Sequence, residues 1–145
     1  MGGASAQIAF EMDSTKSNAK GLYKIKSRFL DGSEIEFNTF VTSFLGFGAN
    51  EALDHYQDLL IKQINESNIV DPCLPKDYVV SKSSHTFTGL GNFDQCYDSI
   101  TPLLNKDKEC QESNCLFNGV YSPIKDLSLF NFIGVSEFWY TTFEM

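Results

Sequence analysis

The chain opens with Met1-Gly2-Gly3-Ala4-Ser5-Ala6-Gln7, and the run at 7–11 (Gln-Ile-Ala-Phe-Glu) is typical of a short β-strand. Two adjacent glycines allow backbone N–H groups to approach an anion closely, and a serine hydroxyl follows within hydrogen-bonding reach. A glycine turn that leads into a strand is therefore a candidate phosphate-binding loop. The alternative is a flexible amino-terminal tail of small residues, against which only the following strand argues.

The pattern after this first strand predicts a hairpin and then a helix. Strand-like runs at 22–29 and 35–43 flank the turn Asp31-Gly32-Ser33. Apolar side chains then recur at helical spacing, and Asn50 is predicted as the N-cap of this helix. The apolar positions that fall on one face of this helix are Ala52, Leu53, Tyr56, Leu59, Leu60 and Ile64.

The second half of the chain is expected to hold shorter elements. In order, these are an irregular segment at 71–75, extended pieces at 78–80 and 85–88, a helix over about 93–104, a loop at 110–123 and an aromatic cluster at 136–142. Pro102 lies inside the second helix, so we expect that helix to end early or to kink. No repeat or linker divides the chain.

Composition excludes several classes of protein. Eleven basic residues against 19 acidic ones give a formal charge of −8, which is the wrong sign for a nucleic-acid-binding domain. A hydrophobic fraction of 42% is too high for a disordered acidic tail and suits one compact domain. No run approaches the roughly 18 to 20 apolar residues of a membrane helix, and the opening residues lack the pattern of a signal peptide.

Four cysteines indicate disulfides, because no Cys-x-x-Cys or histidine-rich spacing typical of zinc sites is present. Three connectivities are possible, and we favour Cys73 with Cys96 and Cys110 with Cys115 because each pair closes a short loop. Disulfides imply an oxidising compartment. The tripeptide Asn65-Glu66-Ser67 is an N-glycosylation sequon, which agrees with a luminal or extracellular setting.

The opening stretch 2–11 resembles the second phosphate-binding motif of the nucleoside triphosphate diphosphohydrolases, the apyrase family of ecto- and Golgi nucleotidases. That motif is usually written D-[LM]-G-G-A-S-[TA]-Q-I. The resemblance continues in the family's order at 42–52 (Thr-Ser-Phe-Leu-Gly-Phe-Gly-Ala-Asn-Glu-Ala), 71–75 (Asp-Pro-Cys-Leu-Pro), 89–96 (Gly-Leu-Gly-Asn-Phe-Asp-Gln-Cys), 115–120 (Cys-Leu-Phe-Asn-Gly-Val) and 136–141 (Ser-Glu-Phe-Trp-Tyr-Thr). Together these segments cover nearly the whole chain.

The resemblance implies an α/β fold that is part of one lobe of an actin-like (ribonuclease H-like) ATPase. Residues 1–145 would be a single partial domain of the second lobe, and a nucleoside di- or triphosphate would bind between the lobes with Ca²⁺ or Mg²⁺. By this resemblance Gly2, Gly3, Ala4 and Ser5 form the phosphate loop, Ser5 holds the terminal phosphate and the attacking water, and Gln7 orients that water. Phosphoryl transfer needs positioning and charge neutralisation of this kind more than covalent help.

An aromatic pair near the end of the chain has two interpretations. Tyr140, with Trp139, matches a family segment that stacks on the nucleobase, so the resemblance implies base stacking. Ordinary core packing is the alternative interpretation of the same two rings.

Several departures from the family pattern affect what this chain can do. The aspartate that precedes the glycine pair in the family, and that helps to organise the metal, would lie before Met1, so no metal ligand is predicted here. The first phosphate loop and the glutamate base would also lie upstream, so we expect this chain alone to hydrolyse nucleotides very weakly or not at all.

Two further departures bear on the type of relative and its compartment. Ala49 and Gly46 stand where some cell-surface members carry arginine and cysteine, which favours the Golgi or lysosomal type. The expected location is therefore the lumen of the Golgi, lysosome or vacuole, or the extracellular space. Membrane anchoring is expected only through segments outside this chain.

Two other hypotheses stay open at the level of sequence. The chain could be a catalytically dead luminal or secreted nucleotide-binding module, or a structural domain in which the glycine pair is a tail. His55 and His85 lack neighbours at metal-ligand spacing and are interpreted as structural or surface residues. Asp94 and Asp98 stand four residues apart, and we expect them on an exposed helix face rather than in a metal site.

Overall fold

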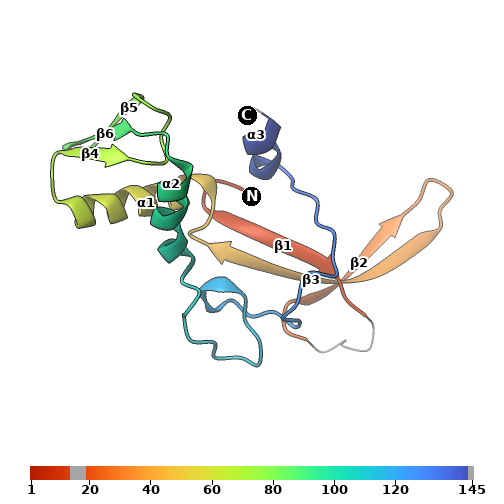
Figure 1. The fold of residues 1–145 in the computed structure, drawn as a ribbon. Coiled ribbons are helices and arrows are strands. Elements are labelled where there is room, and N and C mark those ends of the chain that lie inside the picture. Colours follow the sequence, from red (N-terminus) through yellow and green to blue (C-terminus); the bar gives the residue numbers. More distant parts are fainter. Residues whose placement is uncertain (14–18, 144–145) are drawn as a thin grey trace.

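The computed structural model describes residues 1–13 and 19–143, which form two three-stranded sheets with helices between and beside them (Figure 1). The fold is therefore mixed α/β. Helix α1 lies between the two sheets in the chain and connects them in space. The carboxy-terminal segment returns along the first sheet and places helix α3 near the amino terminus (Figure 1).

The first sheet contains β1 (Ser5–Glu11), β2 (Leu22–Arg28) and β3 (Glu34–Leu45) in the antiparallel order β1-β3-β2. Strand β3 is long because it pairs with both neighbours, β1 along its second half and β2 along its first. The β2–β3 turn is closed by Asp31, whose Oδ1 accepts the Ser33 N–H at 2.9 Å. The predicted strand and hairpin are confirmed, with ends that differ by one or two residues.

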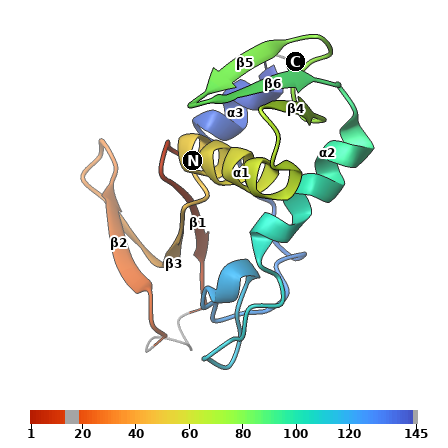
Figure 2. The same ribbon diagram turned by 90° about the vertical axis from the view of Figure 1, so that its left-hand side faces the viewer.

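Helix α1 (Ala49–Ile64) packs beneath a second sheet of β4 (Asn68–Asp71), β5 (Val79–Lys82) and β6 (His85–Gly89) (Figures 1 and 2). The strand order is β4-β6-β5, in which β4 runs parallel and β5 antiparallel to β6. The core between helix and sheet consists of Tyr56, Leu60, Ile69 and Phe87. Strand β4 was not predicted, because it forms through parallel pairing with β6 and no local pattern indicates that pairing.

A separate core lies on the first sheet. Phe10, Met12 and Phe40 are buried there, and the carboxy-terminal segment covers them with Tyr121, Ile124, Leu127 and Phe130. The rings of Phe10 and Phe130 have centroids 5.1 Å apart. Residues more than a hundred positions apart in the chain therefore build this core.

The second predicted helix is α2 (Phe93–Ile100), which continues as the 3₁₀ turn η2 (Thr101–Leu104). Asn92 caps α2 by accepting the Gln95 N–H at 3.0 Å. The α-helix ends just before Pro102, as expected, since proline cannot donate the helical hydrogen bond. The region predicted as a loop contains the short turn η3 (Phe117–Gly119), and the aromatic cluster forms helix α3 (Glu137–Phe143).

Both favoured disulfides are present, Cys73 with Cys96 and Cys110 with Cys115. The first ties the loop after β4 to α2, and the second closes a small loop before η3. Across the described ranges, none of the helices combines the length and apolar character needed to cross a membrane.

Candidate phosphate-binding site

The glycine pair forms a hydrogen-bonded turn at the start of β1. The N–H of Gly2 donates to the carbonyl of Ser5 at 3.0 Å, and the N–H of Gly46 donates to the carbonyl of Ala4 at 2.9 Å. Gly2, Gly3 and Ala4 nevertheless remain exposed to solvent. The segment is therefore hydrogen-bonded to the residue that follows β3 and is open to solvent, so it is an anchored loop and not a tail.

The same loop caps helix α1. Its carbonyls accept the first helical N–H groups: Gly2 from Ala49 at 2.9 Å, and Gly3 from Asn50 and Glu51, both at 3.0 Å. These amides are the ones that an α-helix leaves without internal partners. Figure 2 shows the amino terminus lying against this end of α1. Because the helix amides are already bonded, an anion at this loop would bind through the loop's own N–H groups.

This capping corrects the prediction for Asn50. The helix begins at Ala49 and its N-cap is Gly48, which has no side chain to cap with. The Gly2 and Gly3 carbonyls take over the capping role, so a polar side chain at the N-cap is not needed. The capping contact is made by residues far away in sequence, so the local sequence pattern around Asn50 did not indicate where the helix begins.

Gly48 also leaves the space in which the loop sits. A Cβ at this position would lie 2.4 Å from the Gly2 oxygen and the Ser5 nitrogen, and 2.5 Å from the Ala4 nitrogen. Its φ of −79° is ordinary, so a close backbone approach, not an unusual conformation, requires glycine here. Sequence reasoning missed this residue, although the run Gly46-Phe47-Gly48 directly before a helix was the available signal.

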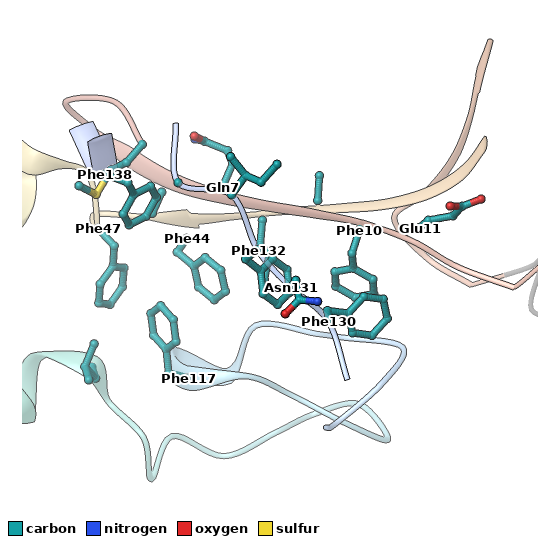
Figure 3. Close-up of a pocket in the computed structure, with 17 residues that line it drawn as sticks. Gln7, Phe10, Glu11, Phe44, Phe47, Phe117, Phe130, Asn131, Phe132 and Phe138 are labelled. Atoms are coloured by element: carbon teal, nitrogen blue, oxygen red, sulfur yellow. The ribbon is translucent and has the colours of Figure 1, made fainter. Parts of the chain in front are cut away.

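Ser5 and Gln7 stand on one face of β1, because side chains alternate along a strand. The Gln7 Nε2 donates to the Ser5 Oγ at 2.5 Å. Ser5 is half-buried and Gln7 is exposed. Figure 3 shows Gln7 on the opposite side of the strand from Phe10 and Phe44. The structure thus brings the two predicted site residues together on a solvent-facing surface beside the loop.

A cavity of about 770 Å³ lies between β1 and the carboxy-terminal segment. Its lining is dominated by phenylalanines, and Phe44 stacks on Phe117 with ring centroids 4.2 Å apart (Figure 3). The phenylalanines that line it are Phe10, Phe44, Phe47, Phe117, Phe130, Phe132 and Phe138. This chemistry suits apolar groups, and Gln7 is one of the few polar side chains in the lining, so the cavity adjoins the Ser5–Gln7 pair.

The aromatic pair at the end of the chain lies on α3. Trp139 is 55% exposed and Tyr140 is 56% exposed, so neither ring is a core residue. The amino group of Met1 donates to the Val135 carbonyl at 3.4 Å, which joins the segment before α3 to the start of the glycine loop. The pair is therefore carried on the element that neighbours the candidate site.

The part of the chain that the structure describes contains no group of three or more His, Cys, Asp or Glu side chains that could hold a metal ion. Asp94 and Asp98 are both exposed on α2. The Nε2 of His55 lies 3.9 Å from the Glu51 carboxylate on the surface of α1, and His85 lies beside Ser84 on β6. The residues present do not fit a metal centre by themselves.

A buried polar cluster joins α1 to β4 in the other core. Asp71 is 1% exposed, and its Oδ1 accepts the Tyr56 hydroxyl at 2.7 Å and the Cys73 N–H at 2.8 Å. Burial, the hydrogen bond to Asp71 and the negative charge of Asp71 raise the pKa of Tyr56 above its usual value. This cluster lies next to the Cys73–Cys96 disulfide and serves the structure.

Comparison with known proteins places these features in a family context. The sequence profile of the GDA1/CD39 (nucleoside phosphatase) family matches residues 1–145. The chain is 40% identical over 147 residues to a Golgi apyrase of Schizosaccharomyces pombe, covering 98% of the chain and 26% of that relative.

Two Caenorhabditis elegans proteins are also similar. A nucleoside-triphosphatase is 34% identical over 98% of the chain and 26% of its own length, and a nucleoside-diphosphatase is 33% identical over 100% and 29%. The chain thus spans little more than a quarter of the length of these relatives.

Proposed function

Because the chain belongs to the GDA1/CD39 (nucleoside phosphatase) family, we propose that it supplies the glycine-loop part of an enzyme that removes terminal phosphates from nucleoside tri- and diphosphates. The observation that carries this proposal is the Ser5–Gln7 pair, joined by a hydrogen bond and held beside the exposed glycine loop. The relatives' names, apyrase, nucleoside-triphosphatase and nucleoside-diphosphatase, support the same reaction class.

The proposed roles follow from the donors and acceptors of each group. The loop N–H groups of Gly3 and Ala4 and the Ser5 hydroxyl contact the terminal phosphate. Gln7 donates through Nε2 to Ser5, and its Oε1 is left to accept a hydrogen bond from the attacking water, which orients that water. Positioning of water and donors aimed at developing charge are the main requirements of phosphoryl transfer.

We propose that residues 1–145 form a partial domain of the second lobe of an actin-like (ribonuclease H-like) two-lobed enzyme. The mixed α/β fold and the antiparallel β1-β3-β2 sheet followed by α1 support this arrangement. A divalent cation, Ca²⁺ or Mg²⁺, would neutralise phosphate charge when bound. Its protein ligands are not assigned to this chain, since the described residues do not fit a metal centre.

Trp139 and Tyr140 are proposed to stack on the nucleobase. Their exposure on α3, next to the start of the glycine loop, supports this assignment. Stacking on an aromatic face tolerates different bases. These two residues are therefore not expected to distinguish one nucleobase from another.

The proposed location is the lumen of the Golgi, lysosome or vacuole, or the extracellular space. Two disulfides and relatives named Golgi apyrase support an oxidising compartment of the secretory pathway. Any membrane anchor is proposed to lie outside these residues. The net charge of −8 argues against nucleic acid as a partner.

The proposal is tested by substituting Ser5→Ala and Gln7→Ala in the complete protein that carries this chain. Loss of one positioned donor is expected to lower turnover of a nucleoside diphosphate by about 10² or more. Ser27→Ala on β2 and Gln63→Ala near the end of α1 are matched controls, because both residues are exposed and distant from the loop. Phosphate release at saturating nucleotide measures the effect.

Unchanged turnover in both site variants would overturn the assignment. A binding-only module is separated by a second measurement on the same protein. Nucleotide would raise its melting temperature without being consumed, since a ligand that binds only the folded state stabilises it.

A further inference from the structure

The turn between α1 and β4 carries the one Asn-x-Ser/Thr tripeptide of the 145-residue sequence, Asn65-Glu66-Ser67. All three residues are exposed. The backbone of this turn is held by its own bonds: the Asn65 N–H donates to Ile61 at 3.0 Å, and the Ser67 carbonyl accepts the Thr86 N–H at 2.8 Å. The main chain is thus anchored while the side chains face solvent.

We propose that Asn65 is N-glycosylated, an inference that rests on the luminal or extracellular location proposed above. In this reaction the Asn65 Nδ2 forms a bond to C1 of an oligosaccharide carried on a lipid diphosphate. The bond from C1 to the phosphate oxygen breaks, lipid diphosphate leaves, and one amide proton is lost. The Ser67 hydroxyl completes the motif that the transferase recognises.

A purely structural explanation accounts for only part of this arrangement. Asn65 has a left-handed conformation, with φ of 51° and ψ of 33°, at the C-cap of α1, where asparagine is tolerated well. The capping role of Asn65 does not explain why a residue with a hydroxyl group, Ser67, follows two positions later. Among the residues that the structure describes, no hydrogen bond of the Ser67 hydroxyl is found, so this side chain is available to be recognised.

The position of Asn65 is compatible with nucleotide binding at the loop. Helix α1 has 16 residues and is therefore about 24 Å long. The glycine loop caps its first turn and Asn65 follows its last turn, so the two sites lie at opposite ends of the helix. A glycan here would cover the α1–β4 turn and the neighbouring strand β4, where Val70 is 58% exposed, and would leave the Ser5–Gln7 face open.

The experiment expresses the complete protein through a eukaryotic secretory pathway and treats it with peptide N-glycosidase. Mass spectrometry is expected to find Asn65 converted to aspartate in the treated peptide, and a glycan mass on the same peptide before treatment. Ser67→Ala and Asn65→Gly should both abolish that glycopeptide, while Ser67→Thr should keep it. Glycine adopts the left-handed conformation of the C-cap readily, so the Asn65→Gly variant keeps the end of α1 intact. Loss of the glycan in this variant is therefore not caused by misfolding.

An unmodified Asn65 peptide in the secreted wild-type protein would overturn the proposal. The proposal is independent of the catalytic assignment in its readout, because Ser67→Ala should leave turnover within about twofold of wild type while removing the glycopeptide. If Ser5→Ala leaves turnover unchanged but the glycopeptide is present, only the catalytic assignment fails.

Discussion

Gly48 shows how one residue can decide whether the glycine loop can lie against α1. Its missing side chain lets the backbone of the glycine loop lie against the start of α1, with loop atoms 2.4 to 2.5 Å from where a Cβ would be. Backbone atoms cannot give way as the far end of a flexible side chain can. The candidate site therefore depends on a glycine that is not among its proposed phosphate contacts.

Replacing Gly48 with alanine is expected to displace the loop and to destabilise the protein by about 1–3 kcal/mol, the usual cost of overpacking. A lower melting temperature measures this effect. Gly2→Ala is the control for stability, because no atom lies within 4 Å of a Cβ at Gly2. Equal melting temperatures for the two variants would contradict the close-approach explanation.

At the scale of elements, polar side chains join α1 to the second sheet at both of its outer strands. The buried Tyr56 hydroxyl bonds to Asp71 on β4, and Lys82 on β5 lies 3.0 Å from Asp54 and 3.1 Å from Asp58. The lysine pairs involve exposed carboxylates and contribute little. The buried pair is the stronger link, because a polar group left unpaired in a core costs about 1–3 kcal/mol.

The raised pKa of Tyr56 predicts a loss of stability at alkaline pH. An unfolded tyrosine ionises near pH 10, whereas folded Tyr56 keeps its proton to higher pH, so the unfolded state gains from ionisation first. Above about pH 10 the free energy of unfolding should fall by up to about 1.4 kcal/mol per pH unit from this residue.

Denaturant unfolding between about pH 9 and 11 measures the slope. Tyr56→Phe should flatten it, and Tyr78→Phe, which removes an exposed phenol, should not. Equal slopes in wild type and Tyr56→Phe would show that the buried phenol does not control alkaline stability.

Elements with a clear period could be predicted from the sequence, and those built by distant contacts could not. The helical spacing of apolar residues in α1 and the strand–turn–strand pattern around Asp31 are local signals, and both elements formed as expected. Within α1, Leu53 and Ile64 are nevertheless exposed and Gln57 is buried, so the buried face coincides only in part with the apolar one. Strand β4 depends on its parallel pairing with β6, which no local pattern reports. The glycine loop was proposed as a phosphate site from its glycine pair and from the resemblance, but its capping of α1 and the role of Gly48 required the structure.

At the scale of the molecule, two separate cores are each small, and disulfides reinforce one of them. Cys73 and Cys96 enclose the loop, strand β5 and strand β6 beside the α1 core, whereas Cys110 and Cys115 enclose a loop outside both cores. Large apolar side chains also remain exposed, among them Leu129 at 87% and Ile133 at 90%. Such surface is typical of interfaces with further protein.

The two disulfides are expected to contribute unequally to stability. In the loop-entropy account, the sequence separation of 23 gives about 3 kcal/mol and the separation of 5 about 2 kcal/mol. Cys73→Ser with Cys96→Ser should therefore lower the melting temperature more than Cys110→Ser with Cys115→Ser. Thiol titration of the unfolded, unreduced chain should find no free thiol, and four thiols would overturn the pairing.

The capping of α1 by the glycine loop has a consequence for the order of folding. The first turn of α1 finds its hydrogen-bond acceptors more than forty positions earlier in the chain, across the whole β2–β3 hairpin. Such a non-local contact forms only after the intervening chain has closed, which costs entropy and is slow. We therefore expect the amino end of the helix and the glycine loop to form together, after the first sheet has assembled.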